Sequence, residues 1–315
     1  MSDPARPPQP EIHEREPLQR FPWWLQLLSR LPFAVLYALA DFLAFLAEYV
    51  VRHRRAVIDM QLKRCFPELD AAGLTRLRRA YYRNFADVVV ESLKAVTIEA
   101  DELRSRFELR GFELLREQVD AGHTVILATS HNCNWEWTLQ IVSLELGRPL
   151  DAAYKPLHQA WSDRLFLGIR SRFGAQMVPA KRLLKHVLRR RQEPRVVAMV
   201  ADQDPVSAAV RYFTTFFGQD TAFYQGPEML ARAVQGSIVF VAPRRIGRGR
   251  YAVDFELLVA HDEQLPPGAM TERYVRRVEA LIREHPSDWL WSYRRWKLRR
   301  NARGQVTRGT GMDPG

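Results

Sequence analysis

The feature that most constrains the fold is an alternation of short apolar segments and helical segments that begins at about residue 106. The strongest strand candidate is TVILATS (124–130), and a helix is expected directly after it at 135–146. Strands that alternate with helices pack in layers, so we predict an α/β fold with a layered parallel or mixed sheet flanked by helices. Further strands are expected at FELRG (107–111), 151–154, 196–201, 237–244 and 251–258, and further helices at FELLREQVDAG (112–122), 160–173, 181–191, 226–235 and 269–285.

A long apolar segment precedes this domain. Residues 31–51, LPFAVLYALADFLAFLAEYVV, are long enough to cross a hydrocarbon core, which needs about 20 apolar residues. Asp41 and Glu48 lie on one face of such a helix, and acidic groups are costly at bilayer depth. We therefore expect a helix that lies in the interface or inserts shallowly. A spanning helix with this face against protein, and a buried helix of a soluble domain, are the alternatives.

Charge and aromatic residues favour the membrane interpretation. The chain carries a formal net charge of +11, which suits anionic lipid, nucleic acid, phosphorylated substrates or an acidic carrier protein. Trp23 and Trp24 stand just ahead of the apolar segment, as is typical of a membrane interface. The basic cluster at 52–55 predicts that this end of a membrane-bound segment faces the cytoplasm. No zinc, RNP or helix-turn-helix signature is present, so we expect no nucleic-acid partner.

These patterns divide the chain into four parts. We expect a disordered tail at 1–20, a membrane-associated helical segment at 21–100, an α/β domain at 101–300 and a disordered basic and glycine-rich tail at 301–315. A second helix is expected at 71–98 with Asp70 as its N-cap. The two cysteines, Cys65 and Cys133, form no CxxC pair, so a reducing compartment is the default.

The stretch that carries chemistry is ATSHNCNWEW (128–137). His131 follows the predicted strand 124–130 at its carboxyl end, where ligands bind in open α/β sheets. Glu136 stands five positions on and can fold back onto the imidazole. A histidine held by a carboxylate is a general base that can take the proton of an attacking hydroxyl. Cys133 is the rival nucleophile, but the sequence places no partner for it, and a buried cysteine is more often a packing residue.

The same stretch resembles the N/H-x4-D/E box of the bacterial lipid A biosynthesis acyltransferases, within the lysophospholipid acyltransferase superfamily. The N-terminal segment 31–69, which ends in FPEL, resembles the membrane-anchoring entry of that family. The resemblance covers about 20 to 300. Its other segments, in order, are YKPLH (154–158), IRSRFG (169–174), VADQDP (200–205), FFGQDTAFYQGPEMLAR (216–232) and WLWSYRRWK (289–297). Two departures leave the exact acceptor open: Tyr293 stands where histidine is most common, and no glycine lies between Asp204 and Phe216.

The resemblance implies a role for each matched residue. His131 would be the base and Glu136 its orienting partner. Arg170 would hold a phosphate or the oxyanion, with Arg172 as the competing residue. Asp202 is a further candidate and would pair with Arg170. The weaker candidates for substrate or oxyanion binding are Gln203, Lys155 and Gly226.

The resemblance also implies a glycerolipid acyltransferase-like fold and a reaction. A fatty acyl chain would pass from acyl carrier protein to a hydroxyl of a lipid A precursor, at the cytoplasmic face of the bacterial inner membrane, with no metal or organic cofactor. Two alternatives stay open at this point. The acceptor could be a lysophospholipid, an ornithine lipid, a polyene or another glycolipid, or the chain could be a non-catalytic membrane-surface protein.

Overall fold

The computed structural model of the protein describes residues 21–157, 159–205, 211–300 and 305–308. The tail predicted at 1–20 lies outside these residues, and so does most of the tail predicted at 301–315. Residues Val306–Arg308, within that second range, form strand β11, which pairs with β10 (Leu298–Arg300).

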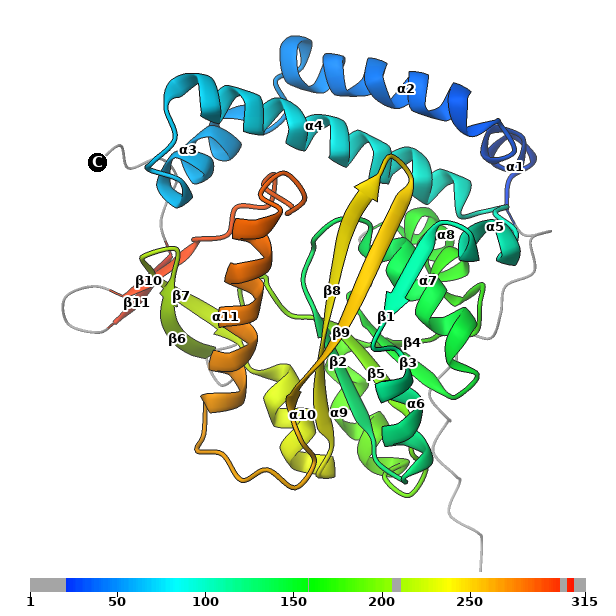
Figure 1. The fold of residues 1–315 in the computed structure, drawn as a ribbon, viewed down its shortest axis with the longest axis vertical. Coiled ribbons are helices and arrows are strands. Elements are labelled where there is room, and N and C mark those ends of the chain that lie inside the picture. The colour runs from blue at the N-terminus through cyan, green and yellow to red at the C-terminus, as the bar shows by residue number, and fades with distance from the viewer. Residues whose placement is uncertain (1–20, 158, 206–210, 301–304, 309–315) are drawn as a thin grey trace, which may run out of the picture.

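A seven-stranded sheet forms the centre of the molecule (Figure 1). Its strands stand in the order β1-β9-β8-β2-β5-β3-β4, and all neighbouring pairs are parallel except the β8–β9 hairpin. The predicted α/β fold with a largely parallel sheet is therefore confirmed. The strand bounds are β1 Phe107–Arg110, β2 Val125–Thr129, β3 Leu150–Tyr154, β4 Gln176–Pro179, β5 Val196–Val200, β8 Ser237–Gly247 and β9 Arg250–Val259.

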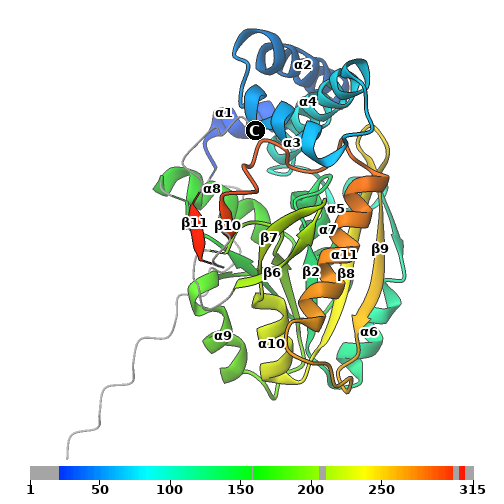
Figure 2. The ribbon, with the colours of Figure 1, turned by 90° about the vertical axis from the view of Figure 1, so that its left-hand side faces the viewer.

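Helices cover both faces of this sheet (Figure 2). Successive residues of β2 point to opposite faces, so Ile126 belongs to one core and Leu127 to the other. One face packs against α6 (Glu113–Asp120), α7 (Trp135–Leu146) and α8 (Ala160–Ser171). The other face packs against α9 (Ala180–Arg189), α10 (Gly226–Val234) and α11 (Ala269–Glu284). These helices agree with the predicted ranges to within a few residues.

The N-terminal helices cap one end of the sheet and share its core. Their bounds are α1 Trp23–Ser29, α2 Phe33–Phe45, α3 Arg55–Cys65, α4 Ala71–Lys94 and α5 Ala100–Arg104. Helix α2 continues as a π-helical turn at Leu46–Val50 and runs along α4 (Figure 1). Leu36 and Ala40 are fully buried on the inner side of α2. Asp70 caps α4 as predicted, since its carboxylate accepts a hydrogen bond from the Gly73 amide.

Both acidic residues of the apolar segment pair with arginines, although Glu48 is buried and Asp41 is exposed. Asp41 pairs with Arg248, and Glu48 pairs with Arg78. Phe33–Val50 is the single stretch of the described residues that is long and apolar enough to cross a membrane, and only 22% of it is buried. The large apolar side chains of this stretch that are exposed form what we call the α2 apolar face: Val35, Leu39, Phe42, Phe45, Tyr49 and Val50.

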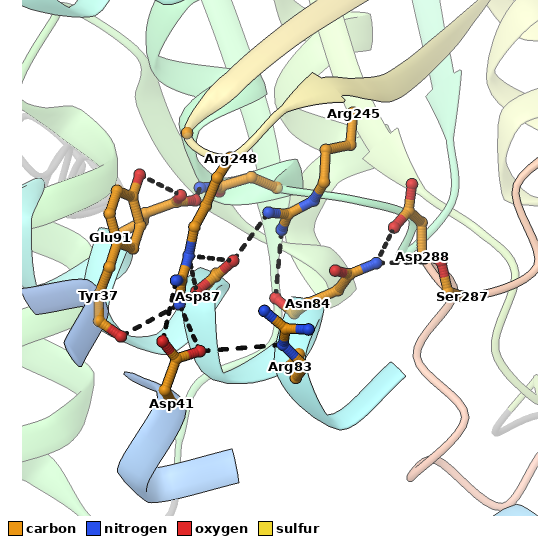
Figure 3. Close-up of polar contacts among 12 residues, drawn as sticks. Tyr37, Asp41, Arg83, Asn84, Asp87, Glu91, Arg245, Arg248, Ser287 and Asp288 are labelled. Atoms are coloured by element: carbon orange, nitrogen blue, oxygen red, sulfur yellow. Dashed lines mark hydrogen bonds and ion pairs between the residues drawn. The ribbon is translucent and has the colours of Figure 1, made fainter. Parts of the chain in front are cut away.

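A buried polar network fastens these helices to the β8–β9 hairpin (Figure 3). Asp87 of α4 accepts hydrogen bonds from Arg245 and Arg248. One turn further on, Glu91 accepts hydrogen bonds from Tyr37 of α2 and from Tyr251 of β9. We call Asp87, Glu91, Arg245 and Arg248 the hairpin network. It fixes the N-terminal helices against the sheet.

The second small sheet is the antiparallel pair β6 (Arg211–Phe216) and β7 (Gln219–Tyr224). The chain between α11 and β10, residues 285–297, packs beside it and is called the closing segment. Arg295 is fully buried, donates to Asp204 and to the Ala222 carbonyl, and lies over the Phe223 ring. Arg295 thus ties the end of the domain to β7 and to the loop that follows β5.

Candidate active site

The turn between β2 and α7 is the centre of the site, and the chain on both sides holds it in place. Asn134 caps α7 by accepting a hydrogen bond from the Trp137 amide at 2.9 Å. The closing segment lies alongside: the Leu290 amide donates to the His131 carbonyl, and the Cys133 amide donates to the Asp288 carbonyl. The backbone around His131 is therefore held by the local cap of α7 and by one segment that is distant in sequence.

His131 pairs with Asp202, and the sheet explains why. Strands β2 and β5 are parallel neighbours, with Thr129 opposite Val200. His131 and Asp202 each stand two residues past that pair, so they leave the sheet side by side at its carboxyl edge. The His131 Nδ1 atom lies 2.7 Å from Asp202 Oδ1, and the Trp289 indole donates to Asp202 Oδ2 at 2.7 Å.

The environment keeps Asp202 ionised. Burial by itself raises the pKa of this carboxyl, but the neighbouring His131 and the hydrogen bonds from His131 and Trp289 bring the pKa below its usual value. An ionised carboxylate only accepts hydrogen bonds, so Nδ1 of His131 is the donor in this pair, and in the neutral imidazole Nε2 is then the nitrogen with the lone pair. The His131 side chain is 20% exposed, while that of Asp202 is 2% exposed. The imidazole is therefore accessible and its partner is not.

Glu136 pairs with Arg170. The Arg170 guanidinium donates through Nε and Nη2 to the two carboxylate oxygens, at 2.8 and 2.5 Å, in a bidentate fork. Burial raises the pKa of Glu136, but the charge of Arg170, its hydrogen bonds and the nearby His131 hold the pKa below its usual value. Trp135 donates a further bond to Glu136 at 3.1 Å.

Two predicted pairings therefore differ from the structure. Among the described residues no hydrogen bond joins His131 to Glu136, whose carboxylate accepts from Arg170 and Trp135 instead. The orienting carboxylate on His131 is Asp202, and it does not pair with Arg170. Arg172, the competing arginine, points away and donates to the Ala95 carbonyl. The structure thus brings these four predicted residues together, but in different pairs from those predicted.

An apolar pocket with a volume of about 310 Å³ opens beside these pairs. His131, Glu136 and Arg170 line its polar end, together with Trp135 and Gln203. Its walls come from the sheet and from α7, and they are apolar: Leu127, Leu139, Val142, Ala152, Met177, Ala198 and Val241. Such a shape suits a ligand with a hydrocarbon body and a polar head.

The remaining candidates divide into two groups. Lys155 and Gln203 line the pocket as predicted for substrate-binding residues, and Lys155 is exposed. Gly226 is buried against the Tyr224 ring and is not among the lining residues. The rival Cys133 is also buried, and burial raises the pKa of its thiol well above the usual value, which makes it a poor nucleophile. Tyr224 and Trp135 line the pocket without having been predicted; the position of Trp135 beside Glu136 was the available signal.

Comparison with known proteins identifies the family. The family model for bacterial lipid A biosynthesis acyltransferases matches residues 21–298. The chain belongs to this family. It is 25% identical over 284 residues to a lipid A biosynthesis lauroyltransferase of Escherichia coli, a match that covers 87% of this chain and 89% of the relative. It is 21% identical over 285 residues, with the same two coverages, to the lipid A biosynthesis palmitoleoyltransferase of that species and to a lipid A biosynthesis acyltransferase of Shigella flexneri.

Family membership establishes the general activity. The chain is an acyltransferase of lipid A biosynthesis, and its substrates are an acyl donor and a lipid A precursor. The pocket beside His131 is the apolar cavity of the described residues that suits the hydrocarbon part of such a donor.

Proposed function

We propose that His131 acts as the general base in transfer of a fatty acyl chain from acyl carrier protein to a hydroxyl of a lipid A precursor. The observation that carries this proposal is the His131–Asp202 pair at the polar end of an apolar pocket. A hydroxyl becomes a competent nucleophile when a base takes its proton as the new bond forms.

The chemistry follows from the tautomer. Nε2 of His131 takes the proton of the acceptor hydroxyl while the hydroxyl oxygen attacks the thioester carbonyl. Collapse of the tetrahedral intermediate breaks the carbon–sulfur bond, and the imidazolium returns the proton to the leaving thiolate. Asp202 keeps the imidazole in the productive tautomer and stabilises its protonated form.

Arg170 and Glu136 supply charge beside the base. Glu136 engages Nε and Nη2 of Arg170, so the guanidinium is held at the pocket with Nη1 left for a substrate oxygen. A fixed cation there stabilises negative charge on a phosphate or on the developing oxyanion.

The α2 apolar face gives the enzyme a route to its lipid substrate. The inner side of helix α2 packs on α4, and Asp41 and Glu48 pair with arginines of the protein. The outer side of the helix therefore presents mainly apolar side chains that are compatible with hydrocarbon. This supports a helix lying in the plane of the inner membrane rather than crossing it. The basic residues at 52–55 follow directly, and they suit the anionic headgroups of the cytoplasmic leaflet.

Mass spectrometry of lipid A tests the proposal. A strain that lacks this gene should produce lipid A that misses one secondary acyl chain, and the wild-type gene should restore that chain. The purified protein should transfer the same chain from acyl carrier protein to the precursor isolated from the deletion strain. Unchanged lipid A, together with loss of an acyl chain from another lipid class, would assign a different acceptor.

A further inference from the structure

Helix α9 carries a stripe of exposed cations. Lys181, Arg182, Lys185 and Arg189 recur at helical spacing and are all exposed, and we call them the α9 basic face. The opposite side of the helix is buried through Leu183 and Val187. Because the helix is anchored by its other side, the four cations project from fixed backbone positions along one side of it.

The four cations stand apart from the ion pairs seen in the described part of the chain. None of the four forms an ion pair with a carboxylate among the described residues, whereas many exposed arginines elsewhere do. Examples are Arg273 with Glu263, Arg277 with Glu256 and Arg300 with Asp220. Lys181 and Arg182 also stand in the first turn of α9, which has no acidic residue, and there the helix dipole disfavours positive charge. Helix stability therefore does not account for them.

The α9 basic face starts beside the pocket that His131 lines. Strands β3 and β4 are parallel neighbours, with Tyr154 opposite Pro179. Lys155 and Ala180 follow these two residues, so they leave the sheet side by side, and both line the pocket. A macromolecule bound to α9 would sit within reach of the site where the thioester must react.

The location of α9 distinguishes a protein partner from a membrane. Both views of the ribbon place α2 and α9 at opposite ends of the molecule (Figures 1 and 2). A membrane that contacts the α2 apolar face therefore does not reach α9. Leu184 and Leu188 are exposed between the cations, and mixed apolar and basic contacts are typical of a surface that binds an acidic protein.

We propose that the α9 basic face, together with Lys155, docks the acidic carrier protein that delivers the acyl chain. This inference rests on the proposed function, which supplies a carrier-bound donor. Docking there holds the carrier on the side of the molecule away from the membrane, with its thioester arm directed along Lys155 and Ala180 into the pocket.

Two donors with the same acyl group test this proposal. The variant Lys181→Glu/Arg182→Glu/Lys185→Glu is compared with wild type, using the acyl chain on acyl carrier protein and on uncharged pantetheine. We expect kcat/KM with the carrier to fall by about tenfold or more, mainly through KM, because opposite charges across an interface speed encounter. With acyl-pantetheine kcat/KM should not change, since that donor has no protein to dock.

A matched control carries the same change in net charge on the other face of the sheet. Arg110, Arg116 and Arg148 are exposed there, and their joint replacement by Glu should leave carrier kinetics unchanged. Equal losses with both donors in the α9 variant, or no loss with the carrier, would overturn the docking proposal. So would weakened binding to anionic vesicles with intact carrier kinetics. If the wild-type protein is inactive with both donors, the proposed function itself is overturned.

Discussion

The site pairs and the hairpin network are both built from buried carboxylates and arginines, but they face different surroundings. His131–Asp202 and Glu136–Arg170 border a pocket with a volume of about 310 Å³. The hairpin network lies between α4 and the β8–β9 hairpin, and none of its members lines that pocket. Buried charge alone therefore does not identify an active site here. The site pairs differ from the network because His131, Glu136 and Arg170 line the pocket.

Protonation separates the two regions as well. The pKa values of Asp202 and Glu136 lie below their usual values, because hydrogen bonds and opposite charges outweigh burial. Burial raises the pKa of Glu91, and its hydrogen bonds and the charge of Arg245 do not offset that effect. The site holds its carboxylates ionised, whereas the network holds Glu91 in an environment that favours its protonated form.

The largest expected effect is at Asp202. The isosteric change Asp202→Asn leaves the shape intact but removes the charge that fixes the His131 tautomer, so we expect kcat to fall by about a thousandfold. Glu136→Gln should cost less, about tenfold to a hundredfold, since it only weakens the hold on Arg170. Steady-state kinetics with saturating donor measure both. A larger loss for Glu136→Gln than for Asp202→Asn would return the orienting role to Glu136.

The hairpin network should respond in stability rather than in chemistry. Asp87→Ala leaves Arg245 and Arg248 without their shared buried carboxylate, which should cost about 3 kcal/mol of unfolding free energy. Asp41→Ala removes the exposed partner of Arg248 and should cost about 1 kcal/mol or less. Urea unfolding in detergent gives both values. If kcat per folded molecule also drops for Asp87→Ala, the separation of the two regions is wrong.

The pocket wall should set the preference for acyl-chain length. Ala198 lies on β5 and lines the pocket, so Ala198→Leu shortens the space for the hydrocarbon tail. We expect kcat/KM for the longest accepted donor to fall by about tenfold while shorter donors are retained, since removing room for methylene groups costs transfer energy for each group. Ala198→Ser is the matched control of similar size. A uniform loss across donors would indicate that the wall is not in contact with the chain.

The smallest effect concerns pH. The pKa of Glu91 is higher in the folded protein than in the unfolded chain, so Glu91 stabilises the fold at low pH and this contribution is lost as pH rises through the folded pKa. The variant Glu91→Gln has no such group to titrate. The melting temperature of wild type should therefore fall relative to that of the variant as pH rises from acidic to neutral. For Glu136→Gln the lowered pKa gives the opposite sign, because its contribution is lost as pH falls. Thermal melts across this range test both signs.

The sequence predicted the sheet because its strands are apolar and separated by helices of clear periodicity. It missed β4, which has only four residues, and the β6–β7 pair, whose mixed polar and aromatic residues lie outside the main sheet. Helix α3 was also missed, because basic residues interrupt its apolar positions. These elements depend on packing with distant parts of the chain rather than on a local pattern.

The site could be predicted as a set of residues but not as a set of pairs. His131 and Asp202 each follow an apolar strand, which the sequence reveals. That their two strands are neighbours depends on the sheet order, which local patterns do not encode. Glu136 is close to His131 in sequence, yet α8 brings Arg170 against it and takes both carboxylate oxygens.

The most direct test of the account is the turnover of His131→Ala with acyl carrier protein as donor and the lipid A precursor as acceptor. Removal of the base should lower kcat by about a thousandfold, within the range for general-base catalysis, while the melting temperature stays close to that of wild type. A folded His131→Ala protein that still transfers the chain at within about tenfold of the wild-type rate would contradict the account, since general bases contribute more than that.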